Sequence, residues 1–344
     1  MKDINKQLID AVINDNIAEI KRLIEAGADV NAADDKDKTV LMFAAERNFK
    51  EVAELLIAHG ADVDAEDYFD YTALLYAASF NSTDVAEVLL EQHPNIYAKN
   101  DNKDTALVIA AKQNSKKMAE LILEHSCDYE EDIEALVCAA AHNSKEVAEL
   151  LIAKNIHEYE AYIEGGATAL MAAAAHNSKE VAELLIAAGA DVNDVDDEKE
   201  TALMYAARNN SKKVAELLIA HGADVNVVSE SWKTALIYAA EYNSKEVAEL
   251  LITQGANVDF ADENGITALM YAAEQNSKEI AELLIDHGAD VNEADGAGST
   301  VLNYVLGNNS KEVAELLLEK TTAVNDCEGF EKDQILDWLR PKKV

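Results

Sequence analysis

The chain has 344 residues, 49% of them hydrophobic, and carries 66 acidic against 29 basic side chains, for a formal net charge of -37. This charge opposes binding to nucleic acid or anionic lipid and favours a basic partner, unless it serves only to keep the chain in solution. Because there is no membrane-length apolar run, no signal-peptide core and no paired cysteine spacing, the sequence predicts a cytoplasmic protein.

Repetition is the strongest pattern in the chain. The stretch NSKEVAELL begins at Asn143, Asn177, Asn243 and Asn309, and near-copies begin at Asn48, Asn81, Asn114, Asn210 and Asn276. A common register position falls at Lys6, Thr39, Thr72, Thr105, Glu134, Thr168, Thr201, Thr234, Thr267 and Thr300. Seven of these nine intervals are 33 residues, and the intervals on either side of Glu134 are 29 and 34. Such a period predicts stacked supersecondary units.

Three segments follow in chain order, and together they predict one domain over residues 1–344. Residues 1–35 form an N-terminal capping repeat, because polar side chains replace the Thr, Leu and Ala of inner repeats. Residues 36–326 form nine further repeats. Residues 327–344 form a C-terminal half-repeat cap, in which Trp338 covers the end of the core.

Each repeat is predicted to contain two short helices and an extended turn. Thr201 is an N-cap for the first helix, and Asn210 ends that helix in the left-handed conformation. Ser211 then caps a second helix, which ends at Gly222. Helices this short need packing against neighbouring repeats to persist.

Three consecutive repeats depart from this pattern between residues 93 and 165. Where other repeats have Gly-Ala after the second helix, these have His93-Pro94, Ser126-Cys127 and Asn155-Ile156. We therefore expect locally irregular hairpins in this part of the chain.

The unit closely resembles the ankyrin repeat. Thr-x-Leu, the Ala-Ala pair, the Leu-Leu of the second helix, Gly-Ala-Asp-Val-Asn and the 33-residue period all match over residues 5–326. Ala replaces the family's Pro after Thr, and Asn replaces the Gly between the helices. The resemblance implies an all-α solenoid of about ten helix-turn-helix repeats with β-hairpin-like loops and a C-terminal capping helix. It also implies a non-enzymatic module for protein–protein interaction.

No motif indicates catalysis or a cofactor. The sequence lacks a phosphate-binding Gly-rich loop, a nucleophile elbow, a His-Glu-x-x-His zinc motif and a Cys-x-x-Cys pair. His142 with His176, in equivalent positions of adjacent repeats, is the alternative for a metal site, and acidic runs at 62–67 and 194–198 are the alternative for calcium. Cys138 is interpreted as a small buried thiol. We predict no metal.

The resemblance implies that partners bind the concave side, which consists of the hairpin tips and the exposed face of the first helix. The relevant residues are those just before the register position and those seven and eight residues after it. One cluster there is Tyr68, Phe69, Tyr71 and Phe80; a second is Trp232 with Tyr242. A ladder of rings four residues after the register position either lines the groove floor or packs between helices. Its members are Phe43, Tyr76, Tyr205, Tyr238, Tyr271 and Tyr304.

Carboxylates crowd the same hairpins, at Asp34, Asp35, Asp37, Asp67, Asp70, Glu130, Glu131, Asp196, Asp197, Glu198 and Glu200. Aromatic rings among carboxylates suit a protein or peptide that presents Lys or Arg beside apolar groups. The chain is thus predicted to be a monomeric adaptor for a basic protein. An inhibitor that masks a basic enzyme such as a nuclease toxin, and an effector secreted by an intracellular bacterium, are the alternatives.

Overall fold

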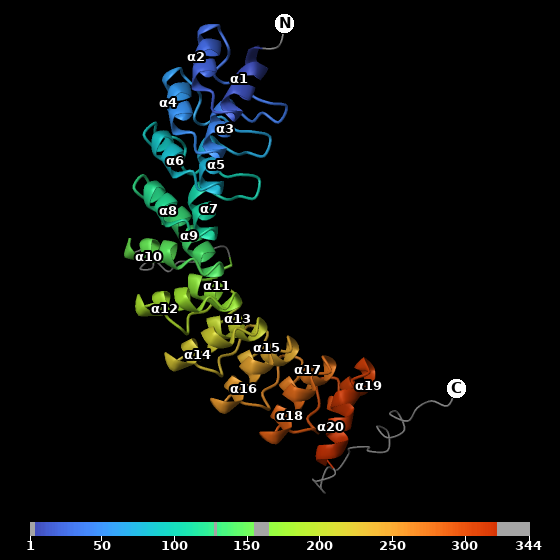
Figure 1. The fold of residues 1–344 in the computed structure, drawn as a ribbon. Coiled ribbons are helices and arrows are strands. Elements are labelled where there is room, and N and C mark those ends of the chain that lie inside the picture. Colours follow the sequence, from blue (N-terminus) through green and yellow to red (C-terminus); the bar gives the residue numbers. More distant parts are fainter. Residues whose placement is uncertain (1–3, 127–128, 155–164, 322–344) are drawn as a thin grey trace, which may run out of the picture. The chain divides into compact units, whose positions relative to one another are not determined.

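The computed structural model describes residues 4–126, 129–154 and 165–321, and the described part consists of helices and loops without β-strands (Figure 1). It divides into two compact units, Met1–Tyr159 (unit 1) and Glu160–Val344 (unit 2). The all-α solenoid architecture predicted from the sequence is confirmed. The single-domain organisation remains a prediction, and the predicted cap at 327–344 lies outside the described residues.

Unit 1 contains five pairs of antiparallel helices. The first helices of the pairs are α1 (Ile4–Ile13), α3 (Val40–Glu46), α5 (Ala73–Ser79), α7 (Ala106–Lys112) and α9 (Tyr129–Ala141). The second helices are α2 (Ile17–Glu25), α4 (Lys50–Ala58), α6 (Thr83–Leu90), α8 (Lys116–Leu123) and α10 (Lys145–Ala153). First helices pack on first helices of the neighbouring repeats and second helices on second helices, from α3 onward.

Unit 2 repeats the same arrangement. Its first helices are α11 (Ala169–Ala175), α13 (Ala202–Arg208), α15 (Ala235–Glu241), α17 (Ala268–Glu274) and α19 (Val301–Asn308). Its second helices are α12 (Lys179–Ala187), α14 (Lys212–Ala220), α16 (Lys245–Thr253), α18 (Lys278–Asp286) and α20 (Lys311–Thr321). The first helices form one layer of the unit and the second helices form the other.

The alanine pair explains how closely the first helices stack. Ala206 and Ala207 of α13 are completely buried, as are their equivalents in the neighbouring helices. Thr201 caps α13 as predicted, because its hydroxyl accepts the Met204 backbone N–H at 3.4 Å. Small side chains on one face, together with a capped N-terminus, allow a seven-residue helix to persist within the stack.

The Asn after each first helix has two roles. Asn210 has a φ of 52°, which confirms the predicted left-handed conformation. Its side-chain oxygen also accepts the Val247 N–H in the first turn of α16, one repeat later. Ser211 stands at the N-cap of α14 as predicted, but its hydroxyl makes no capping hydrogen bond. The Ser211 Oγ is buried without a hydrogen-bond partner.

We expect Asn210→Ala to lower the free energy of unfolding by about 2 kcal/mol, because alanine must adopt the left-handed conformation and the bond to Val247 is lost. Asn210→Gly loses the bond without the strain, so its cost is about 1 kcal/mol. Urea unfolding followed by circular dichroism measures both variants. Equal costs for alanine and glycine would show that the left-handed conformation contributes no strain.

The irregular stretch predicted from residue 93 onward is partly visible. Helices α6 and α8 have eight residues where their regular counterparts have nine, and α9 has 13 residues where α7 has seven. His93 adopts a φ of 54° in the place that Gly60 holds one repeat earlier. The rest of the predicted irregularity, at 127–128 and 155–164, lies outside the described residues.

Candidate binding site on the hairpins and first helices

Most of the described hairpins are organised by one acidic side chain. Asp262 is 5% exposed, and its Oδ1 accepts the backbone N–H groups of Asn264 at 2.8 Å and Ile266 at 3.0 Å. The residue between them, Gly265, is left-handed with a φ of 80°. Asp67, Asp196 and Asp295 hold their hairpins in the same way. These carboxylates are therefore part of the scaffold.

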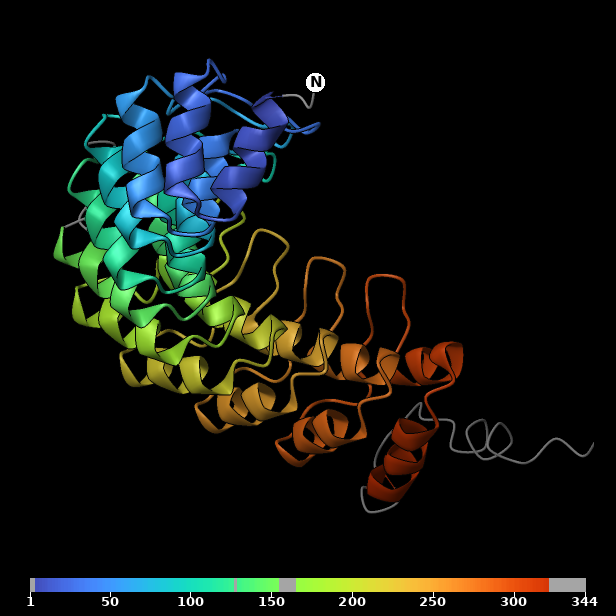
Figure 2. The ribbon, with the colours of Figure 1, turned by 45° about the horizontal axis from the view of Figure 1, so that its top comes forward.

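Hairpin tips of consecutive repeats are joined by backbone hydrogen bonds. In unit 1 the Tyr68 N–H donates to the Lys36 carbonyl at 3.0 Å, and in unit 2 the Glu230 N–H donates to the Glu198 carbonyl at 2.8 Å. Figure 2 shows the hairpins before α15, α17 and α19 side by side. Within each unit the tips and the first helices thus form one continuous surface, which we call the hairpin face.

The tyrosine ladder uses its hydroxyls internally. Tyr76 donates to Asp67 at 2.7 Å, and Tyr271 donates to Asp262 at 2.8 Å. Tyr205 and Tyr304 do the same with Asp196 and Asp295. Tyr238, whose hairpin has Ser229 in place of Asp, donates instead to Glu200 of the preceding repeat. The ladder hydroxyls therefore fasten first helices to hairpins, while a contact of these rings with a ligand stays a prediction.

Burial, followed by the hydrogen bond to a carboxylate, raises the pKa of the ladder tyrosines; for Tyr304 the pKa rises to about 12. A raised pKa means that the folded state holds the proton more tightly than the unfolded chain, whose tyrosines ionise near pH 10. This contribution to stability is complete below about pH 10 and is lost progressively as the pH rises above that value. As the pH rises from 9 to 11, the free energy of unfolding should fall less for Tyr271→Phe than for wild type. Urea unfolding at each pH measures both proteins. An unchanged pH dependence would contradict this role.

Cations of the chain itself cover several ladder rings. The Lys38 Nζ lies 3.9 Å from the centre of the Tyr76 ring and pairs with Glu46 at 2.8 Å. Lys233 lies 4.8 Å from the Tyr271 ring and pairs with Glu241 at 2.7 Å. These cations were not predicted from the sequence. In the sequence, such a cation can be recognised as one member of a pair of opposite charges eight residues apart. This pair occurs in four repeats, at Lys38–Glu46, Asp104–Lys112, Glu200–Arg208 and Lys233–Glu241.

Arg208 makes the most extensive of these contacts. Its Nη2 lies 2.7 Å from Glu200 Oε1, and its guanidinium lies 4.5 Å from the Tyr238 ring, 5.5 Å from Tyr205 and 5.7 Å from Tyr242. Tyr238 and Tyr271 are 5% and 8% exposed. Cations from a partner therefore have little access to these two rings.

Five of the predicted site residues are nevertheless strongly exposed. Among the described residues, the exposed large hydrophobic side chains are Tyr68 (75%), Phe69 (39%), Phe80 (54%), Val195 (38%), Trp232 (60%) and Tyr242 (51%). All except Val195 were singled out from the sequence, and all five rings lie on the hairpin face.

The exposed rings fall into two groups, each within one repeat, and we call these groups patches. The Phe80 patch consists of Tyr68, Phe69 and Phe80 in unit 1, where Tyr68 and Phe69 meet edge to face at 5.3 Å and Phe80 stacks on Tyr76 at 6.4 Å. Tyr71, half-buried, lies 5.1 Å from Tyr76 beneath them. The Trp232 patch consists of Trp232 and Tyr242 in unit 2.

Trp232 has an unusual backbone conformation. Its φ is 59°, and the residues at the same hairpin position in the next two repeats are Gly265 and Gly298, with φ values of 80° and 83°. A left-handed conformation costs a bulky residue about 1–2 kcal/mol relative to the right-handed one. The indole therefore stays in water on a strained backbone.

The other candidate sites receive little support from their contacts. His142 and His176 belong to different units, and each donates Nδ1–H to a carbonyl of its own helix, at 2.8 Å and 3.0 Å. The described residues contain no group of three or more His, Cys, Asp or Glu side chains arranged to hold a metal ion. Cys138 is half-buried with a free thiol, and burial raises its pKa.

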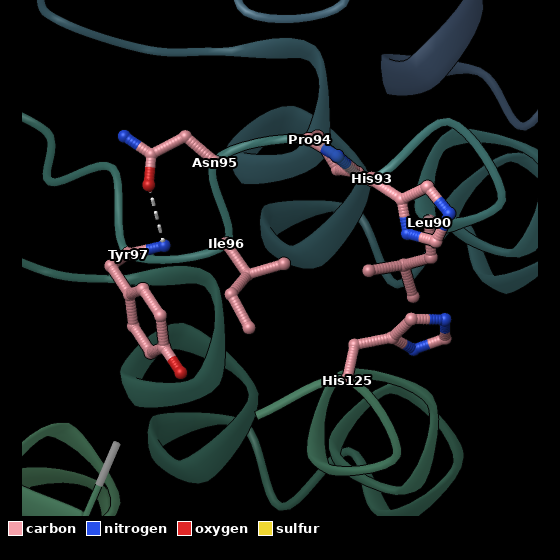
Figure 3. Close-up of a pocket in the computed structure, with 7 residues that line it drawn as sticks. All are labelled: Leu90, His93, Pro94, Asn95, Ile96, Tyr97 and His125. Carbon is pink, nitrogen blue, oxygen red and sulfur yellow. Dashed lines mark hydrogen bonds between the residues drawn. The ribbon is translucent and has the colours of Figure 1, made fainter. Parts of the chain in front are cut away.

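A pocket of about 220 Å³ lies at the C-terminal ends of α6 and α8 (Figure 3). It is lined by Leu90, His93, Pro94, Asn95, Ile96, Tyr97 and His125. His125 donates its Nδ1–H to the Leu121 carbonyl at 3.0 Å. In the sequence, the replacement of Gly-Ala by His93-Pro94 marks the position of this pocket. None of the exposed rings of the two patches lines the pocket.

A family model of ankyrin repeats, described as three copies, matches residues 8–100, 93–162, 155–229 and 227–295. The chain belongs to the ankyrin-repeat family. No curated protein matches it. Ankyrin repeats are modules of protein–protein interaction and are generally non-enzymatic, which fits a chain whose hairpin face carries exposed rings. None of the helices in the described part of this ankyrin chain is long and apolar enough to cross a membrane.

Proposed function

We propose that this ankyrin-repeat protein binds a basic protein or peptide through the exposed rings of its hairpin face. Trp232 carries the proposal. A large side chain that is 60% exposed, on a backbone that favours glycine, contributes little to stability. Exposed aromatic side chains are enriched among the residues that dominate binding energy. Recognition therefore explains why Trp stands where the next two repeats have glycine.

The charges around the rings indicate the chemistry of the partner. Glu198, Glu230 and Glu263 are exposed on three consecutive hairpin tips next to Trp232, held together by the backbone bonds between tips. Asp70 and Asp101 are exposed beside the Phe80 patch. Carboxylates around aromatic rings favour Lys or Arg by charge steering and by cation–π contact at the open ring faces.

The proposal extends to the state of the protein in the cell. It describes a monomeric, non-enzymatic adaptor in the cytoplasm, supported by the free thiol of Cys138 and by the net charge of -37. The identity of the captured partner distinguishes an adaptor from an inhibitor of a basic enzyme.

We expect wild-type protein on a column to retain a basic protein from a lysate of the source organism and to release it as salt rises. Trp232→Gly should weaken this binding about tenfold or more. The same change should leave the free energy of unfolding at least unchanged, because glycine relieves the left-handed strain and the indole buries little surface. Retained proteins are identified by mass spectrometry, and stability is measured by urea unfolding.

Lys199→Gly is the matched control. Lys199 holds the same hairpin position one repeat earlier, with a φ of 57°, so this variant makes the same backbone change without removing a ring. Lys199 pairs with Glu230 at 3.4 Å, so its removal also frees a carboxylate beside Trp232, and this variant should bind at least as tightly as wild type. Equal retention by Trp232→Gly, or retention of acidic proteins only, would overturn the proposed function.

A further inference from the structure

We infer that the chain has two independent docking sites of the same chemistry, the Phe80 patch in unit 1 and the Trp232 patch in unit 2, and that it binds two basic segments at once. This inference rests on the proposed function. Each segment would present Lys or Arg beside an apolar side chain.

The two patches are built in the same way. Phe80 and Tyr242 are the C-cap residues of α5 and α15, and their N–H groups donate to the carbonyls of Tyr76 at 3.1 Å and Tyr238 at 3.0 Å. In both repeats the hairpin that precedes the helix adds further exposed rings. The structure therefore places the same combination of a helix-end ring and hairpin-tip rings at two points of the chain.

A cation from the preceding repeat covers the ladder ring next to each patch. Lys38 lies 3.9 Å from the Tyr76 ring, and Arg208 lies 4.5 Å from the Tyr238 ring. Each of these cations is paired with a carboxylate, Glu46 or Glu200. The chain's own cations also reach one outer ring of each patch, since Lys36 lies 5.6 Å from the Phe69 ring and Arg208 lies 5.7 Å from the Tyr242 ring. The cations of a ligand are thereby left to the remaining outer rings and to the carboxylates of the tips.

The repeats between the two patches have polar residues where the patches have exposed rings. At the helix-end position these repeats have Gln113, His142, His176 and Asn209 in place of a ring. The described hairpin tips of this stretch present exposed polar residues, at 101–103 and 197–199. Along the chain, the exposed rings thus form two groups, and the repeats between them have polar residues at these positions.

The division of the fold makes each patch complete by itself. Each repeat depends on its neighbours for its core, and each patch lies inside its own compact unit with neighbouring repeats on both sides. Neither patch needs a residue of the other unit. A ligand with two suitable segments would gain affinity by engaging both patches, since the second contact becomes intramolecular.

Two full-length variants report on the patches separately by fluorescence. The chain has two tryptophans, so Trp338→Phe leaves Trp232 as the reporter of its own patch. Tyr68→Trp combined with Trp232→Phe and Trp338→Phe reports on the Phe80 patch. The probe is a short peptide that repeats Arg-Leu-Gly, and a Glu-Leu-Gly peptide is the control. Both reporters should respond to the arginine peptide, and calorimetry on wild type should give two bound peptides per chain.

Removal of one patch separates the possible outcomes. With Phe69→Ala and Phe80→Ala added to the Trp232 reporter, its Kd should change less than about twofold, because the changed residues and Trp232 belong to different compact units and share no partners. The stoichiometry should fall from two to one. A response from one reporter only, or a Trp232 response weakened about tenfold by these changes, would overturn the two-site inference and leave a single site. If neither reporter responds, the proposed function fails as well.

Discussion

Asp262→Ala is expected to lower the free energy of unfolding of unit 2 by about 3 kcal/mol. The side chain is 5% exposed and accepts three hydrogen bonds, two from the backbone of its hairpin and one from the Tyr271 hydroxyl. Alanine removes all three, and it leaves the Tyr271 hydroxyl without its acceptor. Urea unfolding of the full chain, followed by circular dichroism, measures the loss.

Three variants define the origin of this loss. Asp262→Asn keeps an oxygen for the two backbone donors, as Asn100 does in its own hairpin, so it should cost less than alanine. Tyr271→Phe removes one bond and should cost about 1 kcal/mol. Glu263→Ala makes the same charge change at an exposed position of the same hairpin and should fall within about 0.5 kcal/mol of wild type. If Asp262→Ala costs no more than Glu263→Ala, the hairpin does not depend on this carboxylate.

Arg208→Met is expected to cost about 3 kcal/mol, because it leaves the nearly buried Glu200 carboxylate without its counter-charge. Arg208 also covers the face of the Tyr238 ring at 4.5 Å, which the variant exposes. The same urea experiment measures this change.

Two comparisons test the cause. Adding Glu200→Gln to Arg208→Met removes the uncompensated charge and should restore most of the loss. Lys212→Met removes a cation from an exposed pair with Glu216 and should change the free energy of unfolding by less than about 0.5 kcal/mol. A double variant as unstable as Arg208→Met alone would show that packing on Tyr238, and not charge, explains the effect.

The sequence predicted most of the fold because each local rule agreed with the repeat period. Thr201 caps its helix and Asn210 is left-handed, as their residue types and positions indicated. The contact of the Asn210 side chain with the Val247 N–H at the start of α16 was not predicted, because its two residues belong to different repeats. Local preferences describe a residue and its neighbours in sequence, and this contact joins positions more than 30 residues apart.

The sequence by itself determined the repeat architecture, since the period assigns each position to a helix or to a hairpin. Only the tertiary structure decided that Tyr68, Phe69, Phe80, Trp232 and Tyr242 are exposed while Tyr71 is half-buried. Only the tertiary structure decided that the Tyr271 hydroxyl is bound to Asp262 and that Arg208 covers Tyr238. It also decided that the two patches belong to separate compact units. The physical reason is that such contacts depend on side-chain direction and on packing between repeats, which a one-dimensional pattern does not contain.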